Sequence, residues 1–174
     1  MLPFRELPGL PPYGPPAQNF SDTGFGKHSE GYVVEFFPGE DRCWVGNFHR
    51  GLSKCDRVLQ HFDNRHLIVV SGGSAYVVDP SAEAVVETFG ADIDYCEAAA
   101  GSEVLIFGNG LWFEFVFSNG LRTHTKRISW DGMRSVILDG LTLRGDAYDP
   151  IQDTWIAFEV DVLEGTVTGG SYNI

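Results

Sequence analysis

The chain has 174 residues, a hydrophobic fraction of 43% and an aromatic fraction of 13%, which are the proportions of one folded domain with a sizeable core. Its formal net charge of −12 argues against nucleic-acid binding, because phosphates demand clustered lysine and arginine. No apolar run reaches the length of a membrane span, and prolines break the N-terminus, so we expect no membrane segment and no secretory signal.

Residues 1–30 are predicted to form an extended arm outside the sheets. Six of the nine prolines fall in this stretch, at positions 3, 8, 11, 12, 15 and 16. Such a density of proline favours a polyproline conformation. We expect residues 31–174 to form a single all-β domain.

Apolar and polar residues alternate with a period of two over residues 141–148 and 155–162, which is typical of strands with one buried face. The pattern of strand, turn and strand recurs upstream, which gives four pairs of segments. Turn residues separate the two members of each pair. The four turns are expected at residues 38–41, 79–82, 118–120 and 162–165. In the last pair, Ile156, Phe158 and Val160 are predicted to point into the core.

Equivalent turn positions recur at a nearly constant interval. Pro38, Asp79, Ser118 and Asp161 are 41, 39 and 43 residues apart. A repeat of about 40 residues with four short strands indicates antiparallel β-meander units. Residues 75–89, AYVVDPSAEAVVETF, resemble the inner hairpin of blades in YVTN-type and quinoprotein-type propellers. This resemblance implies a fold and no activity. The predicted fold class is therefore all-β, with the meanders arranged either as a small propeller or as a curled sheet or sandwich.

Between the first and second hairpins, over residues 46–65, the alternation weakens. Apolar residues recur there at intervals of three and four: Leu52, Cys55, Val58, Leu59 and Phe62. This pattern fits either one short helix or a long loop.

The cysteines are odd in number and scattered, which favours free thiols in a reducing compartment, and we expect a cytoplasmic protein. They are Cys43, Cys55 and Cys96. Two cysteines and three histidines form a series of zinc-type ligands: Cys43, His49, Cys55, His61 and His66. Structural zinc sites pair their ligands two to four residues apart, and this series has intervals of five and six. We therefore predict no metal, no cofactor and no disulfide.

No enzyme motif is present. The chain lacks the HExxH, Walker, dinucleotide-binding and Gly-x-Ser-x-Gly patterns. We predict no catalytic residue and favour a non-enzymatic protein. The alternative is a hydrolase or lyase that holds a sugar or other small ligand among loop carboxylates, because clefts assemble from residues distant in sequence.

The charge is unevenly distributed. From His66 to Leu121 the chain contains no lysine or arginine, although carboxylates continue throughout. The candidate binding residues are Glu83, Glu87, Asp92, Asp94 and Glu97. Strand parity predicts that Glu83 and Glu87 share a face, and likewise Asp92 and Asp94. The plainer interpretation is a solvated charged surface. The functional hypothesis is a docking face for a basic protein partner, as in an immunity protein that neutralises a basic toxin.

Overall fold

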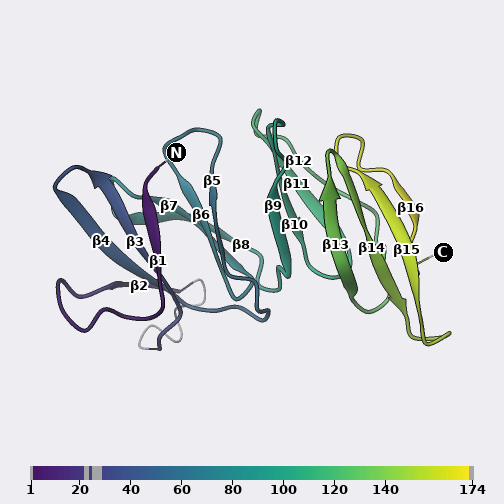
Figure 1. Ribbon diagram of the computed structural model, residues 1–174, viewed down its shortest axis with the longest axis horizontal. Helices are drawn as coiled ribbons and strands as arrows, with labels where there is room; N and C mark the ends of the chain where they lie inside the picture. The colour runs from purple at the N-terminus through teal and green to yellow at the C-terminus, as the bar shows by residue number, and fades with distance from the viewer. Residues whose placement is uncertain (1, 22–23, 25–28, 173–174) are drawn as a thin grey trace. The chain divides into compact units, whose positions relative to one another are not determined.

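The computed structural model describes residues 2–21, 24 and 29–172 and places sixteen strands in four sheets of four strands each (Figure 1). These residues include no helix, and hence none with the length and apolar character of a membrane span. The predicted all-β fold is confirmed. The chain divides into two compact units, Met1–Ile93 and Asp94–Ile174, and each unit contains two of the sheets.

The first unit contains sheets A and B. Sheet A has the order β1-β3-β4-β2, with bounds β1 Phe4–Leu7, β2 Gln18–Phe20, β3 Tyr32–Gly39 and β4 Arg42–Phe48. Sheet B is a meander in chain order, with bounds β5 Arg57–Gln60, β6 Leu67–Ser71, β7 Ser74–Asp79 and β8 Ala84–Phe89. All paired strands run antiparallel except β2, which runs parallel to β4. The stretch 46–65 is loop, apart from the end of β4 and the short β5.

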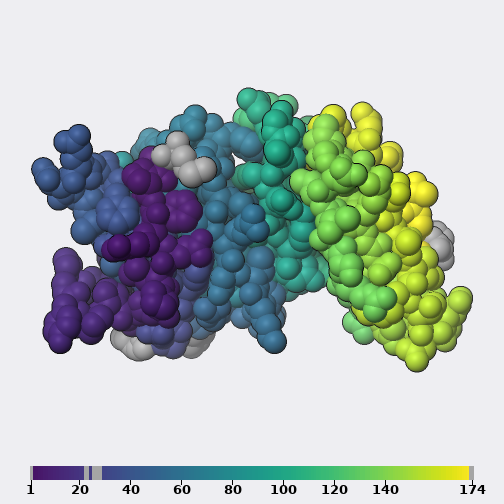
Figure 2. Space-filling view, viewed as in Figure 1, coloured from purple at the N-terminus to yellow at the C-terminus, as the bar shows by residue number. Residues whose placement is uncertain are grey.

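The proline-rich arm belongs to sheet A, so the expectation that it stays outside the sheets is wrong. β1 pairs with β3, and the Arg5 guanidinium binds the Glu35 carboxylate there. β2 pairs with β4 and brings the Phe20 ring 5.2 Å from the Phe48 ring. The prolines flank these strands instead of interrupting them, so no paired backbone N–H is lost. In the space-filling view the purple arm packs directly against blue residues of the same unit (Figure 2).

An aromatic cluster joins sheets A and B. The Phe36 and Trp44 rings stack with centroids 4.4 Å apart, and the Phe48 ring lies 5.3 Å from the Tyr76 ring of sheet B. The Trp44 indole N–H donates a 2.9 Å hydrogen bond to the Pro80 carbonyl. All four rings are buried, so this cluster supplies much of the core of the first unit.

The second unit contains sheets C and D, both meanders in chain order. Sheet C has the bounds β9 Tyr95–Ala98, β10 Val104–Gly108, β11 Phe113–Phe117 and β12 Arg122–His124. Sheet D has the bounds β13 Met133–Asp139, β14 Thr142–Asp149, β15 Thr154–Asp161 and β16 Val167–Gly169. Phe113, Phe115 and Phe158 form the centre of the core between these two sheets.

The meander repeat predicted from the sequence is confirmed for sheets B, C and D, whereas sheet A has the order β1-β3-β4-β2 and is not a meander. Sheets B, C and D begin 38 residues apart, at Arg57, Tyr95 and Met133. All four predicted turns coincide with connections between paired strands: β3 and β4, β7 and β8, β11 and β12, and β15 and β16. Phe158 and Val160 are buried as predicted, whereas Ile156 is half-buried.

An aspartate ends the strand before three of the hairpin turns and binds the turn that follows. In Asp79, Asp149 and Asp161, Oδ1 accepts hydrogen bonds of 2.9–3.3 Å from the backbone N–H groups two and three residues ahead. Each carboxylate thereby satisfies two donors that the hairpin leaves unpaired. This local geometry explains why the aspartates marked these turns correctly in the sequence.

In both sheets of the second unit a glycine lies opposite a phenylalanine of the next strand. Gly108 pairs with Phe113, and Gly145 pairs with Phe158. A Cβ atom at Gly108 would lie 2.7 Å from the Phe113 ring, and one at Gly145 would lie 2.8 Å from the Phe158 ring. Because each buried ring fills the space that a side chain would need, these two positions require glycine.

Candidate functional site

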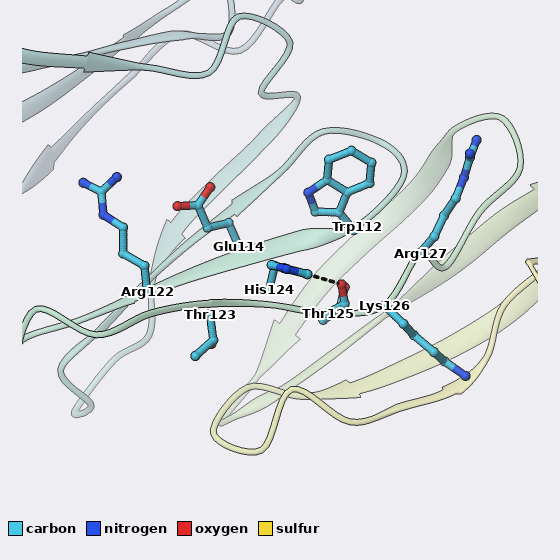
Figure 3. Close-up of a pocket in the computed structure, with 8 residues that line it drawn as sticks. All are labelled: Trp112, Glu114, Arg122, Thr123, His124, Thr125, Lys126 and Arg127. Carbon is cyan, nitrogen blue, oxygen red and sulfur yellow. Dashed lines mark hydrogen bonds between the residues drawn. The ribbon is translucent and has the colours of Figure 1, made fainter.

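A surface pocket of the second unit lies along β12 and the segment that follows it. Its volume is about 480 Å³, which suits a small ligand. The lining residues are Trp112, Glu114, Arg122, Thr123, His124, Thr125, Lys126 and Arg127 (Figure 3). Sequence reasoning missed this pocket, although three basic residues within six positions were a visible signal in so acidic a chain.

Strand alternation selects the side chains on the pocket face of β11. Phe113 and Phe115 point into the core, so Trp112 and Glu114 take the opposite face. His124 of β12 lies directly opposite Glu114 in the register and therefore shares its face. Figure 3 shows the side chains of Trp112 and Glu114 on the same side of their strand.

The His124 ring is held by a hydrogen bond to the backbone of the next residue. Its Nδ1 atom lies 2.9 Å from the Thr125 carbonyl oxygen, the interaction dashed in Figure 3. A carbonyl oxygen only accepts, so Nδ1 carries the proton and Nε2 is the acceptor in the neutral ring. The Thr125 hydroxyl oxygen is buried and accepts a 3.1 Å hydrogen bond from the Phe113 N–H. These contacts fix the ring that Glu114 faces.

The pocket gathers three of the five basic residues of the second unit: Arg122, Lys126 and Arg127. The other two, Arg134 and Arg144, form ion pairs with carboxylates of sheet D. Arg127 donates 2.8 Å hydrogen bonds to two backbone carbonyls, and its guanidinium lies 4.9 Å from the centre of the Tyr172 ring. Positive charge therefore concentrates at this pocket, which suits an anionic group better than a cationic one.

The pocket does not hold the pair of carboxylates that glycoside hydrolysis uses. Among the residues that the structure describes, Glu114 is the single carboxylate on its wall. Two smaller pockets, about 250 and 260 Å³ in volume, also have one carboxylate each, Glu35 in the first unit and Asp94 in the second. Two facing carboxylates thus occur in none of these three pockets.

Three of the five predicted binding carboxylates lie in the first unit. Glu83 precedes β8 with a φ of 54° and forms a 2.8 Å ion pair with Arg42. Glu87 lies exposed in β8, and Asp92 lies exposed after it. A β-bulge opposite Val77 and Val78 shifts the register of β8. Because Glu83 lies outside the strand and the bulge follows it, the predicted shared face of Glu83 and Glu87 is wrong.

The other two carboxylates, Asp94 and Glu97, lie in the second unit. The Asp94 backbone N–H donates a 2.8 Å hydrogen bond to the Gly108 carbonyl, which fixes the start of β9 beside β10. The Glu97 carboxylate in β9 accepts a 2.6 Å hydrogen bond from the Tyr95 hydroxyl. The structure therefore does not bring the five predicted residues together within one unit.

Of the five zinc-type candidates, the structure brings together His61 and His66. They join Asp63, which the sequence did not single out, in the connection between β5 and β6. Burial opposes ionisation of the Asp63 carboxyl, but hydrogen bonds from the His66 ring, from two backbone N–H groups and from His61 lower its pKa well below the usual range. The three cysteines differ in exposure: Cys43 is exposed, Cys55 is half-buried and Cys96 is buried.

These features define an all-β protein of four-stranded sheets with a carboxylate-rich segment and a basic pocket. No protein-family model and no curated protein matches the chain. It is similar to a solved structure described as a crystal structure of the eukaryotic initiation factor, with 12% sequence identity and a TM-score of 0.42. The match covers 76% of this chain and 37% of that one, so this chain spans well under half its length. A similarity at this TM-score supports no conclusion about function.

Proposed function

We propose that this chain is a non-enzymatic binding protein that docks a basic protein partner through carboxylates of β8, β9 and the segment between them. The single observation that carries the proposal is the charge: −12 overall, with no lysine or arginine from residue 66 to residue 121. A field of one sign steers an oppositely charged partner and raises its association rate. The odd number and the scatter of the cysteines support a reducing compartment, such as the cytoplasm, for this interaction.

The carboxylates contribute unequally to the proposed surface. Arg42 compensates Glu83, so Glu83 contributes least to the attraction. Glu87 and Asp92 are exposed on the first unit, and Asp94 is exposed on the second. Glu97 accepts a hydrogen bond from the neutral Tyr95 hydroxyl and forms no ion pair with the described residues. Four residues therefore remain as the proposed docking set: Glu87, Asp92, Asp94 and Glu97.

We further propose that the four sheets are units of the propeller-blade type. Three consecutive meanders of four strands with starts 38 residues apart support this assignment. The aspartates that bind their own hairpin turns in sheets B and D support it too. Blades of this kind present turns and edge strands as binding surfaces, which fits a docking role.

The pocket on sheet C supports a second role, the binding of a small anionic ligand. Its basic residues, its half-exposed Trp112 and its volume are the observations that favour this role. The hydrolase or lyase alternative remains a weaker proposal, because the pocket offers Glu114 without a second carboxylate.

The docking proposal is tested by removing charge locally and comparing capture of partners from a native lysate. The test variant combines Asp92→Asn, Asp94→Asn and Glu97→Gln. We expect it to lose a basic partner that the parent captures, more strongly at low salt than at high salt. Its melting temperature should be nearly unchanged, because Asp92 and Asp94 are exposed and Glu97→Gln keeps an oxygen that can accept the hydrogen bond of the Tyr95 hydroxyl.

A matched control removes three charges elsewhere, by Glu40→Gln, Asp41→Asn and Glu164→Gln. All three side chains are exposed at hairpin turns, so the net charge changes equally in both variants. Capture by the control should equal capture by the parent. Equal capture by all three proteins at both salt concentrations would show that the carboxylates of residues 92–97 are not the docking site.

A further inference from the structure

Three ligand-bearing side chains converge in the connection between β5 and β6. The Asp63 Oδ2 atom lies 2.6 Å from His66 Nδ1 and 3.1 Å from His61 Nδ1. One ligand atom from each residue lies within 4.8 Å of the other two. Bonds from zinc to nitrogen and oxygen are about 2.0–2.2 Å long, so tetrahedral ligand atoms lie about 3.4 Å apart. The three side chains are close enough for one ion to contact all of them once they rotate to open this spacing.

The backbone of the connection holds this arrangement in place. The Asp63 Oδ1 atom accepts 2.9 Å hydrogen bonds from the Arg65 and His66 N–H groups. The His61 N–H donates a 3.1 Å hydrogen bond to the His66 carbonyl, which closes the loop. Asp63 therefore uses one oxygen to build the turn and keeps the other directed at the two imidazole rings.

The nearest basic side chain is turned toward another carboxylate. Arg65 donates hydrogen bonds of 2.9 and 2.7 Å to Asp79 Oδ2, so its charge is compensated there. The cluster is also reachable from solvent, since the exposed fractions of the His61, Asp63 and His66 side chains are 30%, 39% and 18%. A metal ion can thus enter and keep water in its remaining coordination positions.

We propose that His61, Asp63 and His66 form a site for one divalent transition-metal ion, with zinc as the best match. Two imidazoles and one carboxylate suit Zn²⁺, Co²⁺ or Ni²⁺, whereas Ca²⁺ and Mg²⁺ prefer oxygen ligands throughout. In the metal-free protein a proton on His66 Nδ1 satisfies the carboxylate, whereas His61 Nδ1 accepts a 3.3 Å hydrogen bond from the Asp63 N–H. Metal binding through Nδ1 requires each neutral ring to carry its proton on Nε2. The site is independent of the proposed docking carboxylates.

The experiment uses the full chain without a histidine tag, freed of metal with a chelator. Cobalt(II) is titrated while the visible absorption is recorded, and zinc(II) is then added as a competitor. We expect one cobalt per chain, with absorption bands that zinc abolishes. Because binding to the folded state stabilises it, zinc should also raise the melting temperature.

Two single variants, His61→Gln and His66→Gln, and one control, His49→Gln, identify the ligands. His49 lies outside the cluster, at the end of β4. Each cluster variant should weaken cobalt binding by at least about tenfold, since even outer-shell partners of a metal are worth that much. The control should bind as the parent does. Circular dichroism shows whether each variant is folded, and two separate ligand variants keep the test informative if one is not.

Absence of saturable cobalt binding in the parent would overturn the proposal and leave Asp63 as a turn-capping residue only. Binding that survives in both cluster variants would also overturn it, because the ion would then bind elsewhere. Loss of binding in His49→Gln alone would place the site outside this cluster and contradict the assignment equally.

Discussion

Arg65 and Asp79 form an ion pair with very unequal exposure. The Asp79 side chain is 1% exposed and that of Arg65 is 70% exposed, and two guanidinium nitrogens meet one carboxylate oxygen at 2.9 and 2.7 Å. The other Asp79 oxygen binds the turn between β7 and β8. One buried carboxylate therefore fixes a hairpin turn and also ties the β5–β6 connection to it.

Asp79→Asn should destabilise the protein by about 2–3 kcal/mol, because hydrogen bonds to a charged group are each worth about 1.5–3 kcal/mol. Urea unfolding at neutral pH measures the difference. Asp161→Asn is the control, because Asp161 makes the same turn contacts in an exposed position and forms no ion pair with any residue that the structure describes. An equal decrease in the free energy of unfolding of both variants would show that the ion pair with Arg65 does not contribute to stability.

The Asp79 carboxyl should also make the stability of the protein depend on pH. Burial acts to raise the pKa of Asp79, but hydrogen bonds from Arg65 and from the Ala82 and Ser81 N–H groups outweigh it and lower the pKa. Because the folded-state pKa is depressed, the stabilisation is complete above the unfolded pKa of about 3.9 and is lost as pH falls below it. The stability gap between parent and Asp79→Asn should therefore narrow in acid. A gap that stays constant down to the acid limit would contradict this assignment.

Gly145→Ala should destabilise the second unit by about 1–3 kcal/mol, the usual cost of overpacking. The new Cβ would lie 2.8 Å from the Phe158 ring and 3.0 Å from the Arg134 carbonyl oxygen. Gly39→Ala is the control, because nothing lies within 4 Å of a Cβ there and its φ is not positive. Thermal unfolding measures the melting temperatures of both variants. Equal melting temperatures would contradict the argument that the Phe158 ring leaves no room for a Cβ at position 145.

The three thiols should react in the order of their exposure. Cys43 is exposed, Cys55 is half-buried and Cys96 is 4% exposed. A thiol reagent followed by mass spectrometry should label Cys43 first, Cys55 more slowly, and Cys96 only after denaturant is added. Rapid labelling of Cys96 in the native protein would mean that β9 opens readily.

The basic pocket should bind an anion in preference to a neutral sugar. Inorganic pyrophosphate should shift the Trp112 indole N–H resonance in a saturable way, and glucose should leave it unchanged. The variant Arg122→Gln/Lys126→Gln should abolish the shift, and Trp112→Phe assigns the resonance. A response to glucose alone would favour the carbohydrate alternative, and no response to either would remove the pocket as a ligand site.

The sequence predicted those parts of the fold that depend on local chemistry. Alternation placed Phe158 and Val160 in the core, and aspartates marked turns because each binds backbone donors only two and three residues ahead. The strands β1 and β2 were missed because they are short and lie among prolines. Their pairing depends on the free edges of β3 and β4, which is a non-local property.

The candidate sites were harder to predict for the same reason. Strand alternation predicted that the side chains of Glu83 and Glu87 share a face, but the β-bulge in β8 interrupts this alternation. No residue pattern in the sequence predicts such a bulge. The series of cysteines and histidines included two members of a real cluster, but Asp63 joins them only through the fold of the loop. The pocket is lined by consecutive residues of β12 and of the segment after it, and Glu114 joins them only through the register between β12 and β11.

The arm determines how much unpaired strand edge sheet A exposes. β1 and β2 cover both edges of the β3–β4 hairpin, and Phe20 shields part of its aromatic face. A chain that starts at residue 31 would present two long bare edges, each a template for pairing with another copy. The outermost strands of sheet A are instead only four and three residues long and bordered by proline, which offers an incoming chain little to extend. The arm thus reduces the unpaired strand edge through which two copies of the chain could aggregate.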